Sequence, residues 1–171
     1  MYKTRNDLPV ETRATAIRLL GERLSDSIDL MHQAKQAHWN VKGPNFIALH
    51  KLFDEIVDAV EDYMDLMAER IVQLGGQPEG TIQVAARLST LKNYPLEITS
   101  ENDHVEALSS VLAAFGASVR KAIDHSDEIG DKDTADIFTE ISRGVDKYLW
   151  FTEAHLGRLP IRKEISHVQA A

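Results

Sequence analysis

The feature that most constrains the fold is a helical repeat of apolar residues that recurs along most of the chain. In the first two long segments, apolar side chains return every three or four residues, which places them on one face of a helix. Only the Gly43-Pro44 pair interrupts these segments, and it predicts the end of one helix and the start of the next. We therefore expect helices from about Val10 to Asn40 and from about Asn45 to Gly75.

The remaining periodic segments follow a connection of about thirty residues that contains proline and glycine. One short helix is expected inside this connection, near Thr81 to Leu91. A third long helix is expected to begin at Ser100, a typical N-cap residue, and a fourth to end near Pro160. Because no segment shows the alternation of a strand, we predict an all-α fold: a four-helix bundle with a long crossover that carries a short extra helix.

Length and composition indicate one intracellular domain. The 171 residues suit a single domain over 1–171, with short tails at about 1–9 and 160–171. The chain has no cysteine, no signal peptide and no apolar stretch that could span a membrane, so we expect a cytoplasmic protein. Its net charge of −8, multiplied over a homo-oligomer, would attract cations and repel DNA phosphates.

The second helix carries two pairs of metal-binding side chains. His50 and Asp54 lie one turn apart, as do Asp65 and Glu69, so each pair can converge on one ion. The pairs share a face that points away from the apolar stripe, but they are separated by roughly 16 Å along the axis. No single ion can therefore be held by both pairs of one copy.

A second copy of the same helix would solve this problem. His50 pairs with Glu69, and Asp54 with Asp65, because each pair of numbers adds to 119. Two copies that cross antiparallel at a two-fold axis near residues 59 and 60 would therefore form two equivalent metal sites. His38, just before the Gly43-Pro44 break, would join His50 across the helical hairpin.

The ligand chemistry favours a borderline-to-hard metal ion. Two imidazoles and three carboxylates suit Fe(II), with Zn(II) or Mn(II) as competitors. Taken singly, each of these residues is better explained as a surface charge or an incidental histidine. The complementary spacing of all five favours the metal site instead.

The same residues carry a family resemblance. The run KQAHWNVKGPNFIALHKLFDEI, followed by DLMAERIVQLGG, resembles the signature of the Dps family, the DNA-binding proteins from starved cells or mini-ferritins. The likeness extends through DTADIF and DKYLWFTEAH and so covers most of the chain. It implies a ferritin-like bundle that assembles into a hollow homododecamer. Its two-fold interfaces would carry ferroxidase sites built from His38, His50 and Asp54 of one subunit and Asp65 and Glu69 of the next.

The resemblance also implies an activity. Fe(II) would be oxidised, preferably by hydrogen peroxide, and Fe(III) would be stored as mineral in the cavity, which protects DNA and the cell from oxidative damage. Acidic side chains near a three-fold axis line a pore for iron in this family, which makes Asp131 and Asp136 candidates here. The tetrad SRGV at 142–145 departs from the family's common SRDL. Trp39, next to a ligand, is a candidate electron donor.

Alternatives remain open. The first is a nucleoid-associated protein that coats and compacts DNA, with iron chemistry secondary, but the tails hold few basic residues and predict weak or absent DNA binding near neutral pH. The second is an inert helical scaffold, which would leave the five-residue pattern unexplained. Two Glu-x-x-His tetrads, Glu101 to His104 and Glu164 to His167, match the diiron ligand motif of ferritin-like bundles. Both lie outside a mid-bundle setting and are disfavoured as ligands.

Overall fold

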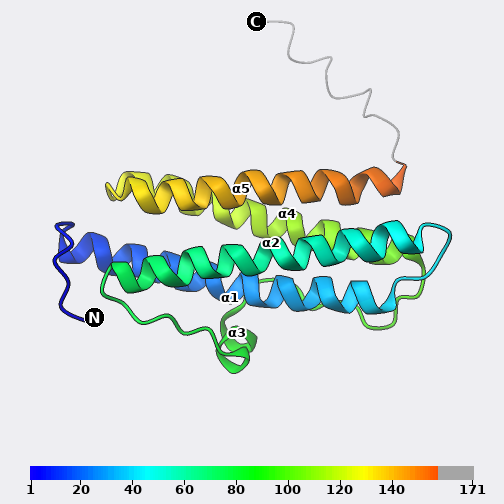
Figure 1. The fold of residues 1–171 in the computed structure, drawn as a ribbon, viewed down its shortest axis with the longest axis horizontal. Coiled ribbons are helices and arrows are strands. Elements are labelled where there is room, and N and C mark those ends of the chain that lie inside the picture. Colours follow the sequence, from blue (N-terminus) through cyan, green and yellow to red (C-terminus); the bar gives the residue numbers. More distant parts are fainter. Residues whose placement is uncertain (158–171) are drawn as a thin grey trace, which may run out of the picture.

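The computed structural model, which describes residues 1–157, is a bundle of four long helices with one short helix outside it (Figure 1). Among these residues no strand occurs, so the all-α prediction is confirmed. The elements are α1 Val10–Asn40, α2 Phe46–Gln73, α3 Ile82–Leu88, α4 Glu101–Glu128, α5 Lys132–Glu153 and a final 3-10 turn, Ala154–Leu156. None of the helices in this part of the chain is long and apolar enough to cross a membrane.

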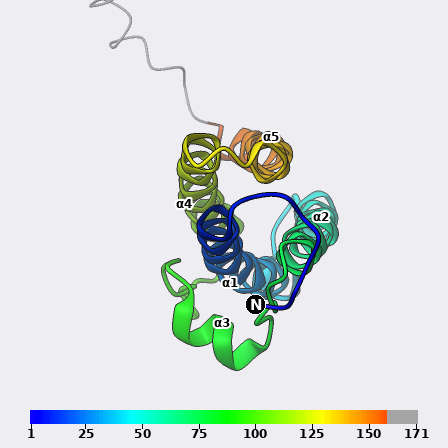
Figure 2. The ribbon, with the colours of Figure 1, turned by 90° about the vertical axis from the view of Figure 1, so that its left-hand side faces the viewer.

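The crossover sets the direction of the helices. α1 and α2 form an antiparallel hairpin, and the long connection then carries the chain back along the bundle, so that α4 runs parallel to α2 (Figure 1). α5 returns antiparallel to α4, and α3 packs on α1 outside the four-helix core, as the end-on view in Figure 2 shows. One crossover connection in a four-helix bundle is the predicted topology.

The apolar stripes fill the space between the four helices. Phe53, Phe115 and Phe138, from three different helices, are fully buried at its centre. Each such side chain contributes about 1.5 to 3 kcal/mol through removal of apolar surface from water. The α2 stripe predicted from periodicity is buried throughout: Leu52, Phe53, Ile56, Val60, Tyr63, Met67, Ile71 and Leu74. The opposite face of α2 is thereby left to polar residues.

The helix ends agree with the predictions at most points, with one correction. Asn45 is the N-cap of α2, and Ser100 is the N-cap of α4. The Ser100 side chain accepts a hydrogen bond from the Asp103 amide. The prediction that the last helix ends near Pro160 was wrong, because α5 ends at Glu153. The chain tightens into a 3-10 turn and reaches Gly157 at φ +59, a left-handed conformation that ends helices. Pro160 lies outside the described residues.

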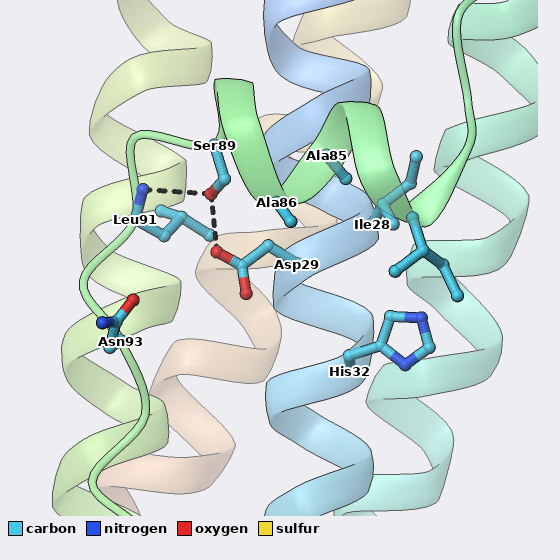
Figure 3. A pocket seen from close by; sticks show the side chains of 9 residues that line it. Ile28, Asp29, His32, Ala85, Ala86, Ser89, Leu91 and Asn93 are labelled. Atoms are coloured by element: carbon cyan, nitrogen blue, oxygen red, sulfur yellow. Dashed lines mark hydrogen bonds between the residues drawn. The ribbon is translucent and has the colours of Figure 1, made fainter.

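Two carboxylates of α1 anchor the crossover. Asp26, which is buried, accepts a hydrogen bond of 2.7 Å from the Thr90 amide, and Asp29 accepts one of 2.6 Å from the Ser89 hydroxyl. Figure 3 shows Asp29 and Ser89 at the wall of a pocket of about 310 Å³ between α1 and α3. None of the five predicted metal ligands lines this pocket, and its edge residue His32 is exposed. The carboxylates here hold the fold together.

The glycine of the SRGV tetrad makes room for a tyrosine. A Cβ atom at Gly144 in α5 would lie 1.7 Å from the Tyr63 hydroxyl oxygen of α2. Any side chain at position 144 would therefore displace the Tyr63 ring. The glycine that replaces the aspartate of SRDL thus leaves the space that Tyr63 of α2 occupies.

Candidate metal centre

The α1–α2 hairpin brings the two predicted histidine ligands together. The His38 Nδ1–H donates to the His50 carbonyl oxygen at 2.7 Å, and the His50 Nδ1–H donates to the His38 carbonyl oxygen at 3.0 Å. The rings stack at 3.7 Å between centroids and 22° between planes. Since a carbonyl oxygen can only accept, each Nδ1 must carry the proton, so the lone pair of a ring in its neutral form lies on Nε2. Backbone contacts of this kind prepare histidines to bind a metal.

Asp54, one turn after His50, already has a cation beside it. The Lys35 ammonium donates a hydrogen bond to Asp54 Oδ1, and His38 Nδ1 lies 3.9 Å from the same oxygen. The hydrogen bond from Lys35 is the largest influence that holds the pKa of Asp54 below its usual value, and the charges of His38, Lys35 and His50 act in the same direction. A metal ion at Asp54 would therefore displace or compete with Lys35. Sequence reasoning missed Lys35, although its position one turn before His38 placed it on the ligand side.

The other two predicted ligands stand apart on the same helix. Asp65 and Glu69 are exposed on α2, and neither side chain makes a hydrogen bond or ion pair with another described residue. In residues 1–157 no three His, Cys, Asp or Glu side chains lie close enough to hold one metal ion. A single chain thus stacks His38 on His50, with Asp54 one turn further along α2, and leaves Asp65 and Glu69 about three helical turns beyond Asp54.

The Glu101 to His104 tetrad has structural partners. Both carboxylate oxygens of Glu101 accept hydrogen bonds from Asn45, in the α1–α2 turn. His104 is buried, and its Nδ1 lies 2.6 Å from the hydroxyl oxygen of Tyr94, in the crossover. Burial lowers the pKa of His104 from its usual value, partly offset by Asp103. The other tetrad, Glu164 to His167, lies outside the described residues.

The two pore candidates occupy different environments. Asp131 is buried as the N-cap of α5, accepts hydrogen bonds from the Thr134 amide at 3.1 Å and the Thr134 hydroxyl at 2.6 Å, and forms a 2.7 Å ion pair with Arg70. Asp136 is exposed on α5. Only Asp136 therefore presents its carboxylate to solvent. Sequence reasoning missed Arg70, because a lone arginine near a helix end gives no sign that it will be buried.

Trp39 extends from the end of α1 beside His38. Its side chain is 66% exposed in the single chain, and Trp150 at the end of α5 is 65% exposed. Neither indole belongs to the bundle core. Tryptophans exposed to this extent are uncommon in an isolated domain.

A four-helix bundle with one crossover connection is the fold of ferritin-like proteins. The family model for the ferritin-like domain matches residues 17–161. The DNA protection during starvation protein of Agrobacterium fabrum is 48% identical over 155 residues, which cover 91% of this chain and 96% of that protein. The protein of the same name from Mycolicibacterium smegmatis is 36% identical over 81% of this chain and 75% of its own.

Solved structures agree with these relatives. Dps from Mycobacterium smegmatis in a tetragonal crystal form aligns with a TM-score of 0.85 at 32% identity, over 90% of this chain and 94% of that one. Dps from Microbacterium arborescens, solved in a high iron form, aligns with a TM-score of 0.80 at 38% identity, over 86% and 96% of the two chains. The chain belongs to the Dps family of ferritin-like proteins.

Proposed function

We propose that this protein is an iron-storing ferroxidase. The observation that carries the proposal is the reciprocal pairing of His38 and His50, whose Nδ1–H groups are both bonded to backbone carbonyls. These contacts leave both Nε2 atoms without a hydrogen-bond partner among the described residues. Fe(II) as substrate would be a suitable partner for them, with Zn(II) or Mn(II) as competitors.

We propose that each complete site is shared between two subunits of a homododecamer. An antiparallel two-fold copy of α2 would bring the partner's Asp65 and Glu69 to His38, His50 and Asp54. The absence of hydrogen-bond partners for Asp65 and Glu69 within the described chain supports this arrangement. The acidic pair then supplies the charge that two neutral imidazoles lack.

The proposed chemistry pairs two one-electron donors with one two-electron oxidant. Two Fe(II) ions reduce one hydrogen peroxide molecule, and with two protons they yield two Fe(III) ions and two water molecules. Since both electrons reach the same peroxide, hydroxyl radical is not released. Fe(III) would then hydrolyse and mineralise in the acidic cavity, with Asp136 as a candidate in the pore for iron and Trp39 as a candidate electron donor.

Iron oxidation followed optically, with peroxide and with oxygen, tests the proposal. We expect peroxide to oxidise Fe(II) much faster in the presence of the protein than in buffer, and faster than oxygen does. The particle mass, measured in parallel, should be that of twelve subunits. A rate equal to that of iron in buffer would contradict the ferroxidase assignment.

We propose that DNA binding is weak near neutral pH, against the alternative of a DNA-compacting protein. The net charge is −8 per chain, and the first nine residues contain only Lys3 and Arg5 as basic side chains. Their segment is also held to the bundle: the Tyr2 amide donates to the Gly75 carbonyl at 2.5 Å, and the Tyr2 hydroxyl donates to Gln77 at 3.3 Å. We expect no stable shift of plasmid DNA in a gel at about 150 mM salt. A stable shift under these conditions would favour the alternative.

A further inference from the structure

The α1–α2 turn is held from outside by the first residue of α4. Glu101 Oε1 accepts a hydrogen bond of 2.7 Å from the Asn45 side-chain amide, and Glu101 Oε2 accepts one of 3.1 Å from the Asn45 backbone amide. In Figure 1 the start of α4 lies at the same end of the bundle as this turn. The contact joins two segments that are 56 residues apart in the sequence.

The turn is shaped to receive this carboxylate. Gly43 adopts φ +149, and a Cβ atom there would lie 2.2 Å from Glu101 Oε2, so only glycine allows the approach. Asn45 is the N-cap of α2, yet its side chain makes no capping hydrogen bond within its own helix. It is directed to Glu101 instead. An N-cap side chain usually bonds its own helix, so this turn forgoes a local contact in favour of a distant one.

The turn also joins the two helices that carry the histidines of the candidate metal centre. Residues 41–45 are all that separate the helices that carry His38 and His50. The reciprocal bonds between each Nδ1 and the other residue's carbonyl require that the end of α1 and the start of α2 keep one relative position. Within the turn itself, one backbone hydrogen bond, from the Phe46 amide to the Gly43 carbonyl at 3.1 Å, helps to fix that position.

We propose that Glu101 is a positioning residue for the histidine half of the metal centre: by holding Asn45 it sets the register in which His38 and His50 present both Nε2 atoms to one cation. The proposal rests on the proposed function, since it assigns Glu101 to that same site. It also gives the Glu101 to His104 tetrad a role, in which Glu101 acts through the turn and binds no metal itself.

The first test replaces the carboxylate and measures metal binding without iron chemistry. In the assembled protein, Glu101→Ala should weaken Co(II) binding, followed by its visible spectrum, by roughly tenfold, as expected for the loss of charge-assisted hydrogen bonds. A crystal structure of the variant without metal should show the two rings no longer stacked. Asp103→Ala is the matched control, because it removes the same charge from the same first turn of α4 without a contact to the α1–α2 turn.

The second test exchanges donor and acceptor across the contact. Glu101→Gln turns an amide N–H toward a donor of Asn45 and should give part of the tenfold loss. Asn45→Asp sets two carboxylates against each other and should bind Co(II) worse than wild type. The double variant restores a donor-acceptor pair with the original net charge, and we expect it to recover most of the wild-type affinity. A role limited to general stability of the bundle would not produce this recovery.

The outcomes separate this inference from the proposed function. If Glu101→Ala keeps both wild-type Co(II) affinity and stacked rings, or if the double variant recovers nothing, the positioning role is wrong. If the wild-type protein neither binds Co(II) nor oxidises iron, the proposed function fails. The ring geometry in the Glu101→Ala crystal structure would then still decide whether Glu101 positions the histidines.

Discussion

The two halves of the candidate metal centre are built in different ways. In the histidine half, the rings of His38 and His50 are fixed by two backbone hydrogen bonds and by stacking, and Asp54 is bonded to Lys35. In the acidic half, Asp65 and Glu69 are exposed and have no hydrogen-bond or ion-pair partner in the described chain. The side chains of the histidine half thus have partners within one subunit, whereas those of the acidic half have none among the described residues.

This difference follows from the chemistry of the ligands. A neutral imidazole binds a metal through one nitrogen only, so its tautomer and ring direction must be set beforehand. A carboxylate can bind through either oxygen and attracts a cation by charge. Two carboxylates one turn apart also repel each other by about 0.2 to 0.5 kcal/mol until a cation lies between them. We therefore expect the histidine half to add to the stability of the chain and the acidic half to reduce it slightly.

The largest expected effect comes from separating the two halves onto different subunits. A variant without His50 and Asp54, and another without Asp65 and Glu69, should each be nearly inactive, because every shared site then lacks one half. After the two are unfolded together and refolded in equal amounts, about half of the two-fold dimers should be mixed, each with one complete site of two. Roughly a quarter of wild-type peroxide-driven oxidation should return.

Mass measurement of the refolded particles provides the control for this experiment. If mixed particles are present and the rate stays at that of the single variants, each site must be completed within one subunit. The proposal that the acidic half of one subunit completes the histidine half of another would then be wrong.

A smaller effect should distinguish the halves by stability. His50→Ala and Asp65→Ala should both slow iron oxidation at least tenfold, since each removes a ligand. His50→Ala should also lower the free energy of unfolding by about 1 kcal/mol, through the lost hydrogen bond. Asp65→Ala should leave it unchanged or raise it slightly. If denaturant unfolding shows that the two variants lower the free energy of unfolding equally, the expectation that only the histidine half stabilises the chain is wrong.

The smallest effect concerns the lysine that is bound to the histidine half. Lys35→Met removes a competing cation and should strengthen Co(II) binding about threefold at neutral pH, in line with the modest strength of exposed ion pairs. Lys51→Met, which removes an exposed lysine of α2 that has no ion-pair partner among the described residues, is the control. A gain of the same size in the control would show a general charge effect.

The effect of Lys35→Met on Co(II) binding should depend on pH. Lys35 holds the pKa of Asp54 below its ordinary value of 3.8, so the wild-type carboxylate stays ionised to lower pH. The stabilisation from this pair is present above pH 3.8 and is lost as the pH falls through the lower value in the folded protein. In Lys35→Met the pKa of Asp54 should rise, so protons compete more strongly with Co(II) for this carboxylate. The stronger Co(II) binding of Lys35→Met relative to wild type should therefore shrink as the pH is lowered toward 4. An advantage that grows in acid would contradict the assigned cause.

Much of the bundle and the composition of the site followed from local patterns. The apolar stripe of α2 and the spacing of His50, Asp54, Asp65 and Glu69 depend only on the geometry of one helix, so the sequence alone determined which face carries these candidate ligands. The Gly43-Pro44 break determined the hairpin that brings His38 to His50. Both kinds of signal act over a few residues and can be recognised without a structure.

Only the tertiary structure decided which charged groups are free and which are already bound. The family resemblance made Asp131 a candidate for the pore lining, but Asp131 is buried in an ion pair with Arg70, 61 residues away. Lys35 holds Asp54 across 19 residues, and Glu101 holds Asn45 across 56. Such pairs form because the packing of separate helices brings their side chains together. Nothing in the residues next to either member determines its partner, which is why the sequence alone predicted the candidate metal-binding face but not the residues that hold it in position.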